Sequence, residues 1–166
     1  MSEVHEHVVL YKEPGLFGGW PANGGIWSWN DEIVVGFNIG LMDYERMEGH
    51  PVKGWTLFPA QARSLDGGHS WEVDDHPHEN PNEKPPTQCP GDVTFTQDDF
   101  AMKVQRTGEH AGHVSWFYTS YDRCRTWYGP YSFPMIGLPG IAARTDYQVL
   151  GPNDCLVFLT APKSDG

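Results

Sequence analysis

The chain has few basic residues and no long hydrophobic run. Lysine and arginine together number 11 against 22 aspartate and glutamate residues, a formal net charge of −11 over 166 residues. Nucleic acids and anionic membranes bind basic surfaces, so neither is expected as a partner. No apolar stretch approaches the roughly 20 residues of a membrane span, and the N-terminus lacks the basic start and apolar core of a signal peptide. These absences predict a cytoplasmic protein.

Cysteine is also scarce. The three residues, Cys89, Cys124 and Cys155, are odd in number and widely spaced, which predicts reduced thiols and no disulfide framework. Neither these cysteines nor the eight histidines form a complete zinc-ligand pattern. We therefore expect no metal and no cofactor.

Helical periodicity is absent, whereas turn-forming and aromatic residues are abundant. The chain has 19 glycines, 14 prolines, seven tryptophans, seven tyrosines and eight phenylalanines. This composition is typical of short strands joined by turns, so it predicts an all-β fold. Asn30-Asp31 is predicted to form a tight hairpin between the first two strands. The predicted strands span 25–29, 32–37, 57–64, 70–73, 92–96, 100–105, 113–120, 126–131, 141–150 and 155–162.

Two glycine- or polar-rich octapeptides recur within this pattern. They are "SLDGGHSW" at 64–71 and "SYDRCRTW" at 120–127, with their aspartates 56 residues apart. Each lies between the third and fourth strands of a four-stranded group, and a turn that recurs at a fixed period marks a repeat unit. Four-stranded repeats of this length predict the blades of a β-propeller.

The predicted blades divide the chain without filling a ring. Blade one spans about 20–75, a proline-rich linker 76–90, blade two about 91–133, and the start of blade three 134–166. About two and a half blades cannot close a propeller. Either the missing blades come from the rest of a longer chain, which is the interpretation we favour, or another subunit supplies them.

The two octapeptides resemble the Asp-box, S-x-D-x-G-x-[ST]-W, the signature turn of sialidase-type propellers. The first copy matches at Ser64, Asp66, Gly68, Ser70 and Trp71. The second matches at Ser120, Asp122, Thr126 and Trp127, with Cys124 in place of the glycine. The aspartate and hydroxyl side chains of such a turn bond its own amides, and glycine permits a positive φ. We expect both aspartates to be structural, on the face of the propeller away from its pocket.

Two further segments resemble a bacterial sialidase-like family. They are "GWPANGGIWSW" at 19–29 and "ARTDY" at 143–147. The resemblance implies the front part of a six-bladed propeller and covers essentially the whole chain. It implies an exo-sialidase-like glycoside hydrolase that removes a terminal acidic sugar with retention. Sialidases use an arginine cluster, an aspartate acid/base and a tyrosine nucleophile paired with a glutamate. The last two would lie beyond Gly166, so we expect the chain alone to be inactive.

The innermost strand of each blade begins near the pocket, which selects candidate substrate-binding residues. These starts place Asn23 in blade one, Asp92 in blade two, and Arg144 with Asp146 in blade three. An arginine fork matches a carboxylate in a bidentate way, so Arg144 is the candidate for the acidic sugar. The plain alternatives are a salt bridge for Arg144 and a strand-start cap for Asp92.

Asp43 and Asp92 are the candidate catalytic carboxylates. Asp43 follows the second strand, where the family's acid/base would fall, and its alternative is a solvated loop carboxylate. The first sialidase arginine belongs to an F-R-I-P motif, and the corresponding residues 17–21 here read "FGGWP", with glycine in its place. That departure keeps open a non-catalytic propeller that binds carbohydrate or a protein partner. A glycosidase of neutral substrates is a third possibility.

Exposed aromatic residues offer a last set of candidates. Trp20, Trp27 and Trp55 are each either a sugar platform or a core residue. Propeller cores use many tryptophans, so we expect most of the three in the core.

Overall fold

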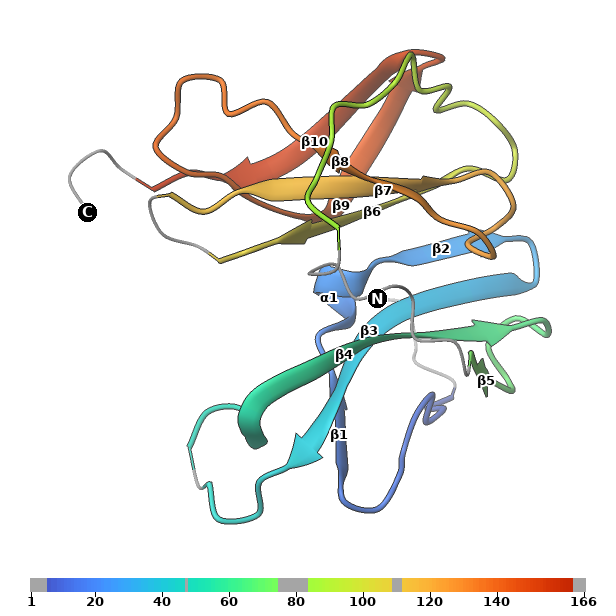
Figure 1. The fold of residues 1–166 in the computed structure, drawn as a ribbon. Coiled ribbons are helices and arrows are strands. Elements are labelled where there is room, and N and C mark those ends of the chain that lie inside the picture. The colour runs from blue at the N-terminus through green and yellow to red at the C-terminus, as the bar shows by residue number, and fades with distance from the viewer. Residues whose placement is uncertain (1–5, 47, 75–83, 109–111, 163–166) are drawn as a thin grey trace, which may run out of the picture. The chain divides into compact units, whose positions relative to one another are not determined.

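A computed structural model describes residues 6–46, 48–74, 84–108 and 112–162 of the chain (Figure 1). The fold is all-β: the described residues form ten strands and one helix of four residues, α1 (Pro21–Gly24). The chain divides into two compact units, residues 1–21 with 26–78 and residues 22–25 with 79–166, and each is described by itself. Among the described residues, no helix has the length and apolar character that crossing a membrane requires.

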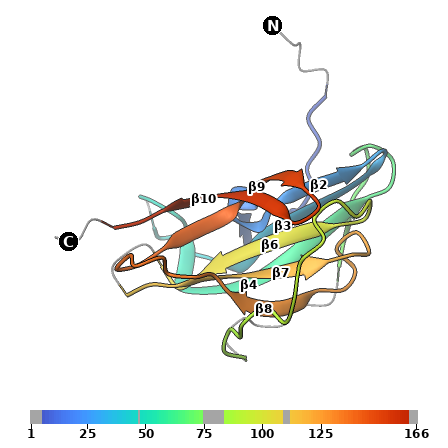
Figure 2. The same cartoon turned by 90° about the horizontal axis from the view of Figure 1, so that it is seen from above.

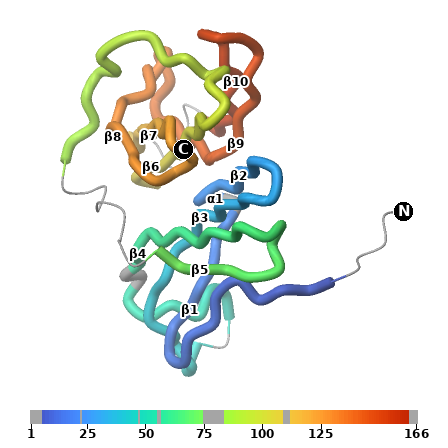
Figure 3. Tube along the Cα trace, turned by 90° about the vertical axis from the view of Figure 1, so that its right-hand side faces the viewer, coloured from blue at the N-terminus to red at the C-terminus, as the bar shows by residue number. Residues whose placement is uncertain are grey.

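The first unit is one antiparallel sheet of five strands. Its long central strand pairs with two short strands, one after the other, along one edge and with a second long strand along the other edge. The strands are β1 (Leu16–Gly19), β2 (Ile26–Trp29), β3 (Glu32–Met42), β4 (Val52–Ser64) and β5 (Glu72–Val73). The meander from β2 to β5 contains the four strands predicted for this part of the chain, and Figure 3 follows its course. The predicted hairpin at Asn30-Asp31 is confirmed, since Trp29 pairs with Glu32 and Asn30 has a φ of 56°.

Strand β1 was not predicted from the sequence. Its two glycines at 18 and 19 weaken any strand pattern, yet the strand forms because aromatic rings lie against its backbone. A Cβ built on Gly18 would come within 2.6 Å of the Tyr11 ring, and one on Gly19 within 2.6 Å of the Phe17 ring. Tyr11 in turn lies 5.3 Å from the buried Phe37 ring of β3. The glycines thus make room for the rings that hold β1 on the sheet.

The second unit holds two sheets. One is the three-stranded antiparallel sheet β6–β7–β8 and the other is the hairpin β9–β10 (Figure 2). The strands are β6 (Ala101–Arg106), β7 (Ser115–Ser120), β8 (Tyr128–Ser132), β9 (Ala142–Gly151) and β10 (Asp154–Thr160). Phe100, Met102, Val104 and Ala143 form the buried core, with β6 and β9 packed against each other. The predicted strands 141–150 and 155–162 are confirmed as this hairpin.

The predicted strand at 92–96 is wrong. Val93 and Phe95 do pack against the core, but their backbone bonds a turn instead of a neighbouring strand. The amide of Phe95 donates to the carbonyl of Pro152 at 2.8 Å, and the side-chain amide of Asn153 donates to the carbonyl of Val93 at 3.2 Å. The alternating apolar residues that predicted a strand are Val93 and Phe95, and they alternate because their side chains pack against the core, without any pairing of their backbone with a strand.

Side chains of β9 occupy the β6 edge that the missing strand would have paired. The amide of Met102 donates to the Tyr147 hydroxyl at 3.1 Å, and that of Val104 donates to Thr145 Oγ1 at 2.9 Å. Buried backbone amides need partners, and two hydroxyls supply them here. Tyr147 is therefore a packed strand residue.

The first repeat turn, residues 64–71, is held by its own side chains. The Ser64 hydroxyl donates to Asp66 Oδ1 at 2.8 Å and accepts the amide of Gly68 at 2.8 Å. Asp66 also accepts the amide of Ser70 at 2.9 Å and its hydroxyl at 2.6 Å. The indole N–H of Trp71 donates to the Gly68 carbonyl at 2.9 Å. Together these hydrogen bonds provide partners for the polar groups at both ends of the turn.

The second repeat turn, residues 120–127, repeats the bonds that the serine and the aspartate make in the first turn. The Ser120 hydroxyl donates to Asp122 Oδ1 at 2.9 Å and accepts the amide of Cys124 at 2.9 Å. Asp122 Oδ1 accepts the amides of Arg125 at 3.0 Å and Thr126 at 2.8 Å. The two octapeptides are therefore equivalent in structure as well as in sequence.

The glycine of the first turn occupies a left-handed conformation that its substitute in the second turn also adopts. Gly68 has a φ of 97° and the fully buried Cys124 a φ of 65°. Residues other than glycine enter this region at a cost in conformational energy. Cys124 remains there because its amide and its buried side chain are both held in place by the turn.

Both turns lie at the same end of their sheets. Ser64, where the first turn starts, pairs with Ile33 near the start of β3, and the Gly67 amide donates to the Asp31 carbonyl at 2.8 Å. In the second unit Ser120 pairs with Ala101, where β6 starts, and an equivalent bond of 3.1 Å joins the Arg123 amide to the Asp99 carbonyl. Each turn thus closes the sheet end at which the preceding strand begins.

Acid is expected to weaken both turns. Hydrogen bonds from Ser70 hold the pKa of Asp66 well below its ordinary value of 3.8. Burial raises the pKa of Asp122, but bonds from Thr126 and Ser120 outweigh burial and lower it. A carboxylate with a lowered folded pKa stabilises fully above the unfolded value and loses that effect as pH falls. Urea midpoints should drop from about pH 5 to about pH 2, and Asp66→Asn and Asp122→Asn should flatten the drop.

The matched control for this titration is the exposed Asp98, which lies outside both turns. Asp98→Asn should keep the pH dependence of the unsubstituted chain. An unchanged slope in Asp66→Asn and Asp122→Asn would show that the turn carboxylates do not stabilise the fold through their charge.

A nearly buried ion pair joins β3 and β4. Arg63 Nη1 lies 2.5 Å from Glu32 Oε1, and the two side chains are 12% and 9% exposed. Removing one partner leaves a buried charge, which costs about 3–5 kcal/mol. Glu32→Gln should therefore lower the free energy of urea unfolding by that amount, whereas Glu32→Leu combined with Arg63→Met should recover most of it. Equal destabilisation by the single and double variants would contradict this account.

Candidate functional site

In the first unit, the loop at residues 43–51 lies at the sheet end opposite the repeat turn. It joins the end of β3 to the start of β4. The half-buried Asp43 begins this loop: its amide donates to the Pro51 carbonyl at 2.9 Å, and its Oδ1 accepts the Glu45 amide at 3.2 Å. Asp43 thus lies at the sheet end opposite the repeat turn, where its carboxylate caps its own loop; its role as acid/base stays a prediction.

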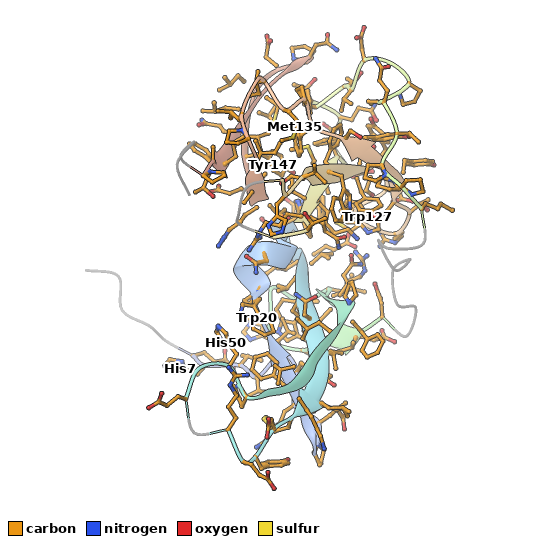
Figure 4. The ribbon with its side chains drawn as sticks, turned by 60° about the vertical axis from the view of Figure 1, so that its left-hand side comes forward. His7, Trp20, His50, Trp127, Met135 and Tyr147 are labelled. Carbon is orange, nitrogen blue, oxygen red and sulfur yellow. The ribbon has the colours of Figure 1, made fainter. Side chains whose placement is uncertain are left out.

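Three aromatic rings meet beside this loop. Trp20 lies 4.9 Å from Phe17 with the planes inclined by 55°, and 4.8 Å from His50 in an edge-on arrangement (Figure 4). Trp20 is half-buried and His50 is exposed. Trp20 also has a φ of 57°, which is an outlier for a bulky residue. Of the other tryptophans considered, Trp27 is a core residue at 8% exposure, and the side chain of Trp55 lies outside the description.

In the second unit, two of the predicted substrate-binding residues lie on β9, and the third, Asn23, belongs to α1. Arg144 and Asp146 alternate with Thr145, so both lie exposed on the same face of the strand. The hydroxyl of Thr145 donates to the backbone carbonyl of Asn23 at 2.9 Å. Because Thr145 points to the opposite face of β9 from Arg144 and Asp146, this bond places the backbone of Asn23 beside the strand but not on their face. That Asn23 shares one site with Arg144 and Asp146 stays a prediction.

The start of β9 lies at the end of the β6–β7–β8 sheet away from the repeat turn. Strand β7 runs from Ser115 to Ser120, where the turn begins. At its first residue, the Ser115 hydroxyl donates to the Ile141 carbonyl at 3.0 Å and accepts the Ala143 amide at 2.9 Å. Arg144 directly follows these contacts. The arginine and the repeat turn thus occupy opposite ends of β7.

Asp92 does not join this group. It is exposed, and the next residue, Val93, is bonded to Asn153 in the turn between β9 and β10. That turn lies at the far end of β9 from Arg144, and a strand rises roughly 3.3 Å per residue. The prediction that Asp92 starts an inner strand beside the pocket is wrong because the strand itself does not form. Asp43 belongs to the first unit and is not placed relative to Arg144.

Sequence analysis missed two residues of interest. His50 lies in a loop whose histidine had no periodic or motif signal. Lys103 is buried between Met102 and Val104 on β6, with Nζ 4.4 Å from the Trp127 ring and 5.1 Å from the Tyr118 ring. A lysine inside an apolar strand pattern was the available signal, since lysine is rarely fully buried. Across the described part of the chain, no three histidine, cysteine, aspartate or glutamate side chains gather as metal ligands would.

Lys103 is expected to increase the free energy of unfolding as the pH rises into the alkaline range. Burial lowers its pKa from 10.5 to about 8. The folded state then releases this proton before the unfolded state, so the free energy of unfolding should rise between these two pH values. Urea unfolding of Lys103→Met should lack that rise relative to the unsubstituted chain. The exposed Lys84→Met is the control, and a rise that persists in Lys103→Met would assign the effect to other groups.

Each unit thus has its own candidate residues: Arg144 with Asp146 on one face of β9 in the second unit, and Asp43 with Trp20 and His50 in the first. Comparison of the chain with protein-family models, with curated proteins and with solved structures gave no match.

Proposed function

We propose that the chain forms part of a sialidase-type six-bladed β-propeller that binds a terminal acidic sugar and belongs to a retaining exo-glycosidase. The observation that carries the proposal is the exposed Arg144, which shares one face of β9 with Asp146 and lies at the sheet end opposite a repeat turn. The four-stranded meander β2–β5 and the equivalent turns in the two units support the propeller.

Arg144 has the chemistry that an acidic sugar requires. A guanidinium group presents a planar fork of donors that matches a carboxylate, and lysine cannot reproduce that geometry. In a chain with a net charge of −11, an exposed arginine at this end provides a local attraction for an anion. Asp146, on the same face, can accept hydrogen bonds from sugar hydroxyls, and the side-chain amide of Asn23 can donate or accept them.

Asp43 remains the proposed acid/base. An acid/base carboxylate transfers a proton to the leaving oxygen, which requires it to stand at the pocket end of its blade. Its position in the loop between β3 and β4 supports this role. Asp92 no longer qualifies, and the nucleophile pair is not assigned to any described residue.

A second candidate is a propeller that binds the sugar without cleaving it. The glycine at the position of the first sialidase arginine favours this candidate, because Gly18 lies directly under the Tyr11 ring. Any side chain there would have to displace that ring. If residues 17–21 correspond to the F-R-I-P motif, this chain has no arginine at the position of the first sialidase arginine, which supports binding without cleavage.

Arg144→Ala tests the proposed function. Losing a bidentate charged contact, worth about 1.5–3 kcal/mol, should weaken binding of N-acetylneuraminic acid by at least about tenfold. Titration calorimetry measures the affinity, and release from the 4-methylumbelliferyl glycoside of the same sugar measures turnover. Arg125→Ala is the control, because this exposed arginine lies in the repeat turn at the other end of the sheet.

The outcomes separate the two candidates. Because the chain alone is expected to be inactive, turnover is measured on the complete propeller that contains it. Turnover that Asp43→Asn abolishes while binding is retained would support the glycosidase. Binding that depends on Arg144, without turnover by the complete propeller, would support the non-catalytic propeller. Affinity that is unchanged in Arg144→Ala would contradict both.

A further inference from the structure

We infer that Trp20 and His50 form a binding subsite for a neutral pyranose ring in the first unit, beside the loop at residues 43–51. This inference extends the proposed function, on which it rests for the class of ligand. It concerns a different part of the chain and a different kind of sugar from the site at Arg144.

The backbone at Trp20 is the first observation. Its φ of 57° is left-handed, and the following residue is Pro21, which disfavours helical conformations at the position before it. Strained backbone of this kind persists only where surrounding contacts hold it, and it is concentrated at ligand sites. Here the strain turns the chain sharply at the end of β1, so that the indole lies against Phe17 and His50.

The second observation is that the ring cluster is built from two separate segments held in register. Strand β1 pairs with β3 and positions Phe17, whose ring lies over Gly19. The opposing loop fixes His50 through a bond of 2.8 Å from the Val52 amide to the His50 carbonyl. Trp20 is therefore flanked by rings on a prearranged support, which lowers the entropic cost of binding a ligand.

The third observation is that Trp20 differs from the structural tryptophans of the same unit. Trp27 is buried in the core. Trp71 is fixed under the repeat turn, with its indole N–H donating to the Gly68 carbonyl. Trp20 instead contacts the exposed His50 at the opposite end of the sheet from that turn. Core packing or turn closure does not explain its position.

The charge around the cluster determines the class of sugar. The neighbouring loop carries Asp43, Glu45 and Glu48 against a single Arg46, whose Nε is already bonded to the Glu48 carbonyl at 2.9 Å. This local negative charge disfavours an anionic ligand. An aromatic face is electron-rich and attracts the slightly positive C–H groups of a pyranose ring. The subsite therefore fits a neutral sugar.

The test is binding of neutral disaccharides to the 166-residue chain. Lactose, cellobiose, maltose and chitobiose are the probes, measured by tryptophan fluorescence and by saturation-transfer NMR. We expect at least one to bind, and Trp20→Ala and Trp20→Gly to reduce its affinity about tenfold or more. His50→Ala should reduce it several-fold. The exposed Tyr44→Ala, in the same loop and 76% exposed, should leave it unchanged.

The variant Trp20→Gly shows whether a loss of binding results from misfolding. Glycine adopts a φ of 57° without strain, so Trp20→Gly keeps the turn while it removes the ring, and its urea midpoint checks the fold. A second readout needs no variant: the His50 ring resonances should shift when the disaccharide is added. Failure of all four probes to bind, equal affinity in Trp20→Gly, or His50 resonances unmoved at saturation would each overturn the inference.

The result is separable from the proposed function. Arg144→Ala should leave disaccharide binding unchanged while it weakens binding of N-acetylneuraminic acid. Neutral binding through Trp20 without any acidic-sugar binding would refute the proposed function alone. Acidic-sugar binding through Arg144 without neutral binding would refute the Trp20 subsite alone.

Discussion

An aspartate that accepts hydrogen bonds from its own turn closes one end of a sheet in each unit. In both copies the serine hydroxyl donates a hydrogen bond to the aspartate carboxylate. The same hydroxyl accepts one from the amide two residues after the aspartate, so a hydroxyl, a carboxylate and an amide are satisfied within eight residues. The carboxylate is a suitable acceptor because charged hydrogen bonds are stronger than neutral ones. With one end of the sheet fixed in this way, the opposite end is left to loops that carry the candidate functional residues.

The two units share this turn but differ in how the backbone amides next to it, on β3 and on β6, are hydrogen-bonded. The first unit pairs β3 on both sides, so its amides are bonded to neighbouring strands. Among the described residues of the second unit, no strand pairs with the outer edge of β6, and Thr145 and Tyr147 bond its amides instead. These same residues alternate with Arg144 and Asp146 along β9. The strand thus has one face that packs against β6 and one face that carries exposed polar side chains.

Local chemistry is what could be predicted from the sequence. The hairpin at Asn30-Asp31, the two repeat turns and the hairpin β9–β10 each depend on residues close together in the chain, and each formed as predicted. Strand β1 and the absent strand at 92–96 depend on distant partners instead. The ring of Tyr11 holds the first in place, and the turn at Pro152 binds the second.

The same distinction applies to the site. The grouping of Asn23 with Arg144 and Asp146 was predicted from the strand starts of the expected blades. The alternation along β9 places Arg144 and Asp146 on one face, whereas Thr145, which bonds the Asn23 carbonyl, lies on the other. The contact between Trp20 and His50 could not be inferred, because it depends on a left-handed backbone at a tryptophan and on the pairing of β1 with β3. No residue type or spacing in the sequence predicts such a conformation.

The hydroxyl bonds along β6 also bear on how the chain behaves among its neighbours. A sheet edge with unpaired amides is a template onto which another extended chain can add, and growth from such edges leads to fibrils. On β6 the amides of Met102 and Val104 already have oxygen partners from Tyr147 and Thr145. A strand of another molecule would have to break these two intramolecular hydrogen bonds before it could pair with β6. The bonds from Tyr147 and Thr145 therefore oppose aggregation at this edge of the sheet.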